Sequence, residues 1–320
     1  MLEDRQVERS RAIQRRTGPT FYFATKFLPE RVREPTHVLY AFFRIADEVV
    51  DDAEVIDRPA EDKRQALESF RAEALGETEP SDPVLEAFRE VKDAHDIPDE
   101  EVNAFVDAME TDVEKKRYAD VTELREYMRG SAAAVGAMMT AIMEPADRDR
   151  AMPHAKALGE AFQLTNFLRD VREDVVDRDR IYLPLRTLER HGVDPDQIAA
   201  LEFDAGIAAA IREELHRTER FYRHGVAGIE TLPDDCQFPV LLAAVLYADY
   251  HRSIRADDCD VITSPPTLSR RRTLSLFART RARWQFNKDP AAVFDAVSPI
   301  SMPAREDRDP TGEPLTLPTP

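Results

Sequence analysis

The chain has 320 residues, of which 42% are hydrophobic, and its 62 acidic and 44 basic side chains give it a formal net charge of −18. A chain of this length can bury one large core, and we expect a single domain. So negative a charge argues against nucleic-acid binding, which needs a basic surface, and it disfavours simple electrostatic docking on anionic lipid.

The elements predicted in chain order are all helices. Glycine is scarce, at 10 residues, apolar residues recur at helical spacing, and the alternation typical of strands is nearly absent, so the fold class is all-α. Thr20 is expected to cap a short helix from Phe21, and Pro35 is expected in the first turn of the next. The other expected helices cover residues 3–16, 60–76, 82–95, 98–116, 122–143, 154–177, 205–231, 236–255 and 267–286. Residues 1–290 should form the helical domain, and residues 291–320 a Pro-rich acidic tail without fixed structure.

The cysteines and the N-terminus indicate a cytoplasmic protein. Cys236 and Cys259 have no metal-binding spacing, which is typical of structural thiols in a reducing compartment. No apolar run approaches the roughly 18 residues that a membrane span needs, and Met1-Leu-Glu-Asp-Arg does not begin a signal peptide. The acidity itself is typical of a surface solvated at high salt and suggests a halophile-like source.

Two helices carry closely spaced acidic side chains. Asp47 and Asp51 lie one helical turn apart, and so do Asp170 and Asp174, which follow Asn166 on one stripe. Like charges at this spacing repel unless a cation lies between them. Mg²⁺ is the natural cation, with Mn²⁺ as a substitute, because it binds few carboxylates and bridges to phosphate oxygens. The alternative is two solvated helix faces, but each pair directly follows an apolar stretch, where polar groups need partners.

Small residues mark the expected helix over 122–143. This segment contains Tyr127, Ala132 and Gly136 among other small side chains. Such a stripe permits close packing of another helix or the approach of a slender ligand, and the spacing does not choose between them.

Longer motifs around both acidic pairs resemble those of the squalene and phytoene synthases. The stretch Gln163-Leu-Thr-Asn-Phe-Leu-Arg-Asp170-Val-Arg-Glu-Asp174, followed by Asp179-Arg-Ile-Tyr-Leu-Pro184, is similar to the second signature of that family. Tyr40-Ala-Phe-Phe-Arg-Ile-Ala-Asp47-Glu-Val-Val-Asp51 is similar to the first, and the match extends over about residues 10–290.

This resemblance implies a single-domain isoprenoid synthase bundle with a central cavity, and the head-to-head (1′-1) joining of two prenyl diphosphates through a cyclopropyl intermediate. It implies that Asp47 and Asp51 hold Mg²⁺ on one side and Asn166, Asp170 and Asp174 hold it on the other. The implied catalytic residues are Tyr40, Arg44, Tyr127, Arg169 and Tyr247, and the implied substrate-binding residues are Thr20, Phe21, Phe43, Ala132, Gly136 and Gln163. One stretch departs from the family: Thr17-Gly18-Pro19-Thr20 replaces a motif with a basic residue, and either Arg15 and Arg16 substitute or the diphosphate is held differently.

The implied activity has two forms. We expect phytoene formation from two geranylgeranyl diphosphates, because a halophile-like source suits a carotenoid route. The alternatives are squalene formation from two farnesyl diphosphates with NADPH, or a non-catalytic helical scaffold, which should have lost its acidic motifs. Substrate chain length, NADPH use and oligomeric state stay open. Peripheral contact with the inner membrane face also stays open, since an apolar substrate would come from a bilayer, and no obligate protein partner is evident.

Overall fold

Helices make up nearly the whole of the protein. The computed structural model describes residues 4–17, 19–51 and 58–302, without the side chains of residues 4–8, 16, 17 and 19. The α-helices are α1 (Asp4–Thr17), α2 (Pro19–Thr25), α3 (Glu30–Asp51), α4 (Ala60–Leu75), α5 (Pro83–Ala94), α6 (Asp99–Glu114), α7 (Val121–Met128), α8 (Ala134–Met143), α9 (Arg148–Arg169), α10 (Val171–Arg178), α11 (Leu185–Arg190), α12 (Pro195–Ala199), α13 (Ala205–Ala227), α14 (Asp234–Ala256), α15 (Arg270–Phe286) and α16 (Pro290–Val297). Within the described ranges, β-type backbone pairing is limited to one isolated bridge between Arg117 and Ile181, so the all-α prediction is confirmed.

Aspartates and prolines set several helix starts. The side chain of Asp82 accepts a hydrogen bond from the amide of Val84 at 2.8 Å, and Pro83 occupies the first helical position of α5. Asp120 and Asp204 cap α7 and α13 in the same way. These caps satisfy amide groups that have no partner within the helix. The predicted starts of these three helices lie close to the observed ones.

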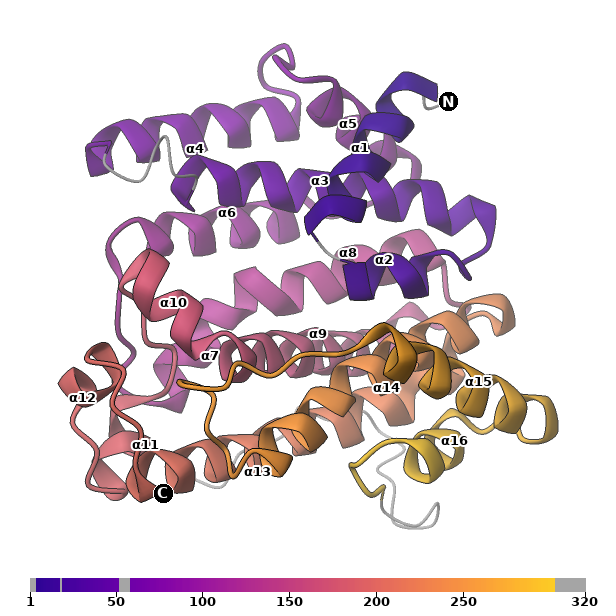
Figure 1. Ribbon diagram of the computed structural model, residues 1–320. Helices are drawn as coiled ribbons and strands as arrows, with labels where there is room; N and C mark the ends of the chain where they lie inside the picture. Colours follow the sequence, from indigo (N-terminus) through magenta and orange to yellow (C-terminus); the bar gives the residue numbers. More distant parts are fainter. Residues whose placement is uncertain (1–3, 18, 52–57, 303–320) are drawn as a thin grey trace.

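The helices pack in layers around α9. In Figure 1, α4, α3 and α6 lie above α9 and α8, while α14 and α13 lie below. The principal core fills the space between these layers, and its upper part is an aromatic cluster in which Phe42 stacks on Phe88 at 3.7 Å and on Phe70 at 4.9 Å. A smaller apolar cluster lies under α10 to α13. The arrangement brings α3 and α9, which carry the two acidic motifs, to the same side of the molecule.

Helix contacts at the small residues are very close. A Cβ atom on Gly130 would lie 1.9 Å from the carbonyl oxygen of Ala104, and one on Gly136 would lie 2.4 Å from that of Ala155. The segment Arg129–Ala133 is a π-helical turn between α7 and α8. Tight packing therefore explains the small-residue stripe, although Ala132 and Gly136 also line a cavity described below.

Four predicted boundaries were wrong. Helix α2 begins at Pro19, so Thr20 lies inside it, and α3 begins at Glu30, because burial of Val32 keeps the turn before Pro35 helical. The predicted helix over 154–177 is two helices, with Asp170 as a one-residue bend at φ −102° and ψ 15°.

The fourth correction concerns the expected tail, because residues 290–300 are structured. Asp289 caps α16, and Phe294, Val297 and Ile300 are buried against the core. The acidic residues that suggested a tail belong mainly to residues 303–320, which lie outside the described ranges.

Candidate active site

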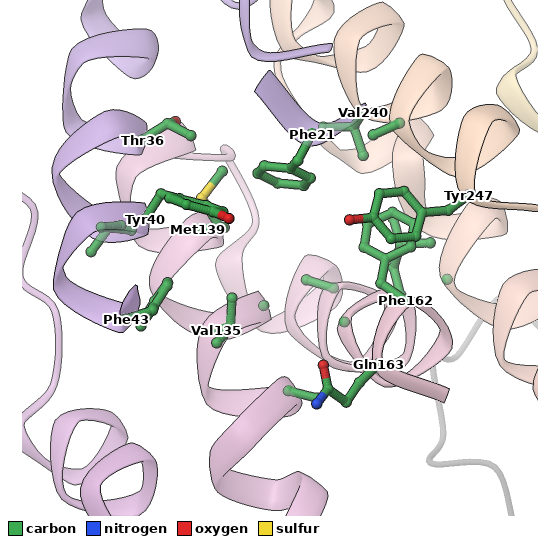
Figure 2. A pocket seen from close by; sticks show the side chains of 18 of the residues that line it. Phe21, Thr36, Tyr40, Phe43, Val135, Met139, Phe162, Gln163, Val240 and Tyr247 are labelled. Carbon is green, nitrogen blue, oxygen red and sulfur yellow. The ribbon is translucent and has the colours of Figure 1, made fainter. Parts of the chain in front are cut away.

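An apolar cavity of about 550 Å³ lies among α2, α3, α8, α9 and α14. Its volume is in the range of small-molecule sites, roughly 300–1,000 Å³. In Figure 2, Tyr40 and Tyr247 face each other across it, with Phe21 between them and Gln163 at the other end. The sequence-predicted residues that line it are Thr20, Phe21, Tyr40, Phe43, Arg44, Asp47, Tyr127, Ala132, Gly136, Gln163, Asn166, Arg169 and Tyr247.

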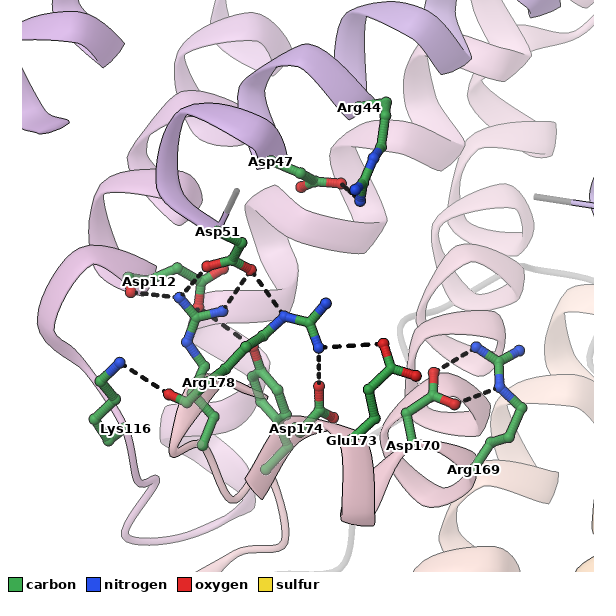
Figure 3. Close-up of polar contacts among 12 residues, drawn as sticks. Arg44, Asp47, Asp51, Asp112, Lys116, Arg169, Asp170, Glu173, Asp174 and Arg178 are labelled. Atoms are coloured by element: carbon green, nitrogen blue, oxygen red, sulfur yellow. Dashed lines mark hydrogen bonds and ion pairs between the residues drawn. The ribbon is translucent and has the colours of Figure 1, made fainter. Parts of the chain in front are cut away.

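The remaining three predicted residues lie beside the cavity and are held in ion pairs. Both carboxylate oxygens of Asp170 accept hydrogen bonds from Arg169, whose Nε atom donates at 2.6 Å. Asp174 accepts a hydrogen bond from Arg178 at 3.3 Å. Asp51 accepts from Arg178 at 3.2 Å and from a second arginine described below. Figure 3 shows Asp47 and Asp51 on α3 facing Asp170, at the bend after α9, and Asp174 on α10.

On the α3 side, Asp47 is short of positive charge. Its side chain is 42% exposed, and the Nη1 atom of Arg44 lies 4.0 Å away, while the Nε atom of Arg44 lies 3.4 Å from Glu48. Although part of this side chain is exposed, the protein packed around the carboxyl group reduces its hydration and raises the pKa of Asp47 to about 7; the charges of Asp51 and Asp112 add to the effect, whereas Arg44 opposes it. An additional cation would favour the ionised form.

On the α9 side, one buried oxygen has no partner. Asn166 donates its amide to Gln163 at 3.4 Å, which leaves its Oδ1 atom buried and without a hydrogen bond from the described residues. Burial also raises the pKa of Asp174 to about 7. A buried oxygen without a partner costs free energy, so this position is suited to an electropositive ligand.

These side chains fit a hydrated divalent cation. The donors are carboxylate and amide oxygens, which Mg²⁺ prefers, and burial raises the pKa of two of the carboxylates, an effect that a bound cation would oppose. Within the described ranges no three acidic, histidine or cysteine side chains form a ready-made metal cage. Mg²⁺ does not need such a cage, because it usually binds one or two protein carboxylates and completes its coordination shell with water and substrate phosphate.

Two residues that sequence reasoning missed connect the two sides. Arg180 is only 3% exposed and donates to both oxygens of Asp51, at 2.9 and 2.8 Å, and to the backbone carbonyl of Asp112 at 2.6 Å. Asp112, on α6, accepts from the hydroxyls of Tyr127 at 2.7 Å and Tyr182 at 3.4 Å. Burial raises the pKa of Asp112 to about 6, and Arg180 opposes that rise.

Only one of these two had a signal in the sequence. Arg180 belongs to the segment after the second motif, which resembled the family but was assigned no role, while Asp112 lies within an ordinary amphipathic helix, α6.

The atypical stretch at residues 17–20 is only partly described. Thr20 lines the cavity, while Gly18 and the side chains of Thr17 and Pro19 lie outside the described residues. Arg15 is exposed and does not line the cavity, and the side chain of Arg16 also lies outside the described part.

The architecture defines a class of protein. A helical bundle around an apolar cavity, with two carboxylate-bearing helices across one end, is the arrangement expected of an isoprenoid synthase. The model of the squalene/phytoene synthase family matches residues 14–278, and the chain belongs to that family.

Relatives of known name agree. The chain is 31% identical to the phytoene synthase of Rhodobacter capsulatus over 88% of this chain and 82% of that protein. It is 32% identical to the phytoene synthase of Cereibacter sphaeroides over 93% and 86% of the two chains.

Solved structures share the fold. A dehydrosqualene synthase superimposes with a TM-score of 0.78 at 24% identity, over 88% of this chain and 98% of the other. A squalene synthase from Alicyclobacillus acidocaldarius does so with a TM-score of 0.69 at 25% identity, over 79% and 94%. The fold prediction is therefore confirmed.

Proposed function

We propose that this protein is a phytoene synthase that joins two molecules of geranylgeranyl diphosphate head to head. The observation that carries the proposal is that Asp47 of α3 and Asn166 of α9 line the same apolar cavity, at the end where the acidic motifs lie. Polar heads would lie at this end, and the prenyl chains would extend among the aromatic and aliphatic side chains. The names of the bacterial relatives support this activity within the family.

Mg²⁺ would be held by Asp47 and Asp51 on α3 and by Asn166, Asp170 and Asp174 on α9 and α10. When bound, it neutralises the diphosphate and makes it a good leaving group. Arg44 and Arg169 face the same end of the cavity, where they brace the neighbouring carboxylates and can donate to diphosphate oxygens.

The cavity wall would protect carbocations. Phe21 stacks near Tyr40 at 6.4 Å, and Phe162 lies 4.8 Å from Tyr247, so aromatic faces border the cavity from four helices. Such faces attract cations and exclude the water that would quench them.

The cellular setting that we propose is the cytoplasm. Cys236 and Cys259 are both free and buried, as expected in a reducing compartment. No helix in the described ranges combines the length and the apolarity that crossing a bilayer takes. The acidic composition supports activity at high salt.

The rival activities are separated by product analysis. Purified protein with Mg²⁺ would receive geranylgeranyl or farnesyl diphosphate, each with and without NADPH. We expect phytoene from the C20 substrate without NADPH. Squalene from the C15 substrate, formed only with NADPH, would contradict the proposal and keep the family. No product from either substrate would favour the scaffold alternative, although the intact acidic motifs speak against it.

A further inference from the structure

The basic residues of this acidic protein are unevenly distributed. Residues 261–288 contain seven basic side chains and no acidic one, in a chain whose net charge is −18. Six of the seven belong to α15. The expectation that charge disfavours anionic lipid was drawn from the net charge of the whole chain, and the charge of this helix has the opposite sign.

Helix α15 has one buried face and one exposed basic face. Leu276, Thr280 and Trp284 turn inward, whereas the arginines at 270, 271, 279, 281 and 283 are exposed. Arg272 is bound to Asp249 at 2.6 Å. No carboxylate of the described chain forms an ion pair with the other α15 arginines, so their charge is available to a partner.

Large apolar side chains lie exposed beside these arginines. Phe286 is 90% exposed and Leu274 is 58% exposed. An exposed phenylalanine and leucine among arginines are typical of a helix that lies in a membrane interface, with apolar groups in the acyl boundary and guanidinium groups at the phosphates. A purely polyanionic partner would leave the apolar groups without a role.

The exposed helix lies against the walls of the cavity. Phe277 of α15 stacks on Phe27 at 4.9 Å and meets Phe23 of α2 edge-on at 5.9 Å. It also packs against Phe238 of α14 at 6.3 Å. Because α2 and α14 both line the cavity, a bilayer at α15 would lie near the helices that enclose the apolar ligand. Figure 1 shows α15 at the outer edge of the molecule, on the side opposite α11 and α12.

We propose that the exposed face of α15 docks the protein on the surface of an anionic phospholipid bilayer. The four arginines 270, 271, 279 and 283 bind lipid phosphates, and Leu274 and Phe286 enter the interface. The net negative charge of the rest of the chain repels the same surface, so docking is oriented with α15 toward the lipid. Docking does not depend on the proposed activity, and each can fail without the other.

Vesicle flotation of the full chain tests this docking. The vesicles contain phosphatidylcholine alone or mixed with phosphatidylglycerol, at about 0.1 M salt, where the Debye length is about 10 Å. We expect binding to the mixed vesicles only. Replacing Arg279 and Arg283 by Gln should weaken it on the order of 20-fold, since each basic residue near an anionic surface contributes roughly fivefold. Phe286→Ser should weaken it several-fold.

The matched control removes two exposed arginines outside α15, Arg186 on α11 and Arg212 on α13. Arg186→Gln with Arg212→Gln changes the net charge equally, and its binding should fall much less. A thermal melt of each variant checks that it is folded. We expect all of them to fold, because the substituted α15 positions are exposed. Equal binding by both double variants, or no binding of the parent protein to either vesicle, would overturn the proposal. Loss with the arginines but none with Phe286→Ser would mean electrostatic contact without entry of Phe286 into the interface, and would overturn the proposed docking too.

Discussion

Arg180 should stabilise the carboxylate end of the cavity, and its removal makes a quantitative test. Its guanidinium binds both oxygens of Asp51 and the carbonyl of Asp112, and it is 3% exposed. The substitution Arg180→Gln keeps a polar side chain but removes the positive charge. It leaves Asp51 and Asp112 without their buried partner.

The expected loss follows from these contacts. A hydrogen bond to a charged group contributes about 1.5–3 kcal/mol, and breaking a buried ion pair costs about 3–5 kcal/mol. The side chain of Asp51 is 22% exposed and keeps Arg178 at 3.2 Å, so water and Arg178 recover part of this. We therefore expect the free energy of unfolding to fall by about 3 kcal/mol. Mg²⁺ should restore some of it by supplying positive charge at the same carboxylate.

Urea unfolding with and without Mg²⁺ measures both effects. The control is Arg186→Gln, whose side chain is 64% exposed and pairs with Asp120 at 3.3 Å. Its loss should stay below about 1 kcal/mol, as for surface ion pairs. Unfolding of Arg180→Gln at the same urea concentration as the parent, or equal stabilisation of both proteins by Mg²⁺, would refute this role of Arg180.

Two further predictions concern stability. Burial raises the pKa of Asp47 and Asp174 to about 7, so the folded protein binds more protons than the unfolded chain. The stability that these two bound protons contribute is full below the ordinary carboxyl pKa and is lost as pH rises through about 7. Without metal, the midpoint temperature of thermal unfolding should therefore fall between about pH 6.5 and about pH 8, which lies above the range in which His37 titrates. Mg²⁺ should oppose this fall, and a midpoint that rises with pH without metal would contradict the prediction. Gly130→Ala should lower stability by about 1–3 kcal/mol, because its Cβ would lie 1.9 Å from the carbonyl of Ala104, although helix propensity alone predicts a gain of about 1 kcal/mol. A higher urea midpoint in Gly130→Ala would show that α6 and the π-helical turn separate readily.

Much of the fold could be predicted because helical spacing and capping residues are local signals. The bend at Asp170 could not, because it spans one residue and the helical hydrogen bonds on either side persist: Asp170 donates to Asn166 and Asp174 donates to Asp170, both at 2.8 Å. Pro35 was misleading for a different reason. A proline removes one backbone hydrogen bond, but buried Val32 and a first turn that bonds to Pro29 keep the helix intact.

Among the site residues too, some could be predicted from local sequence patterns and others could not. Asp47 and Asp170 were visible because each is followed four residues later by a second aspartate, Asp51 and Asp174. Asp112 has no such partner, and its role depends on Tyr127, Tyr182 and Arg180, which only the tertiary fold brings together. The pairing of Arg180 with Asp51 is likewise tertiary, because 129 residues separate the two in the chain.

The dependence of turnover on both acidic helices tests the central claim most directly. Initial rates of product formation with Mg²⁺ would be compared for the parent protein, Asp47→Asn and Asp170→Asn, with Arg186→Gln as control. We predict that each aspartate variant loses at least about 10²-fold in rate, as for other preorganised groups that stabilise charge, while the control keeps its activity. Unchanged turnover in Asp170→Asn would contradict a two-sided metal and diphosphate site.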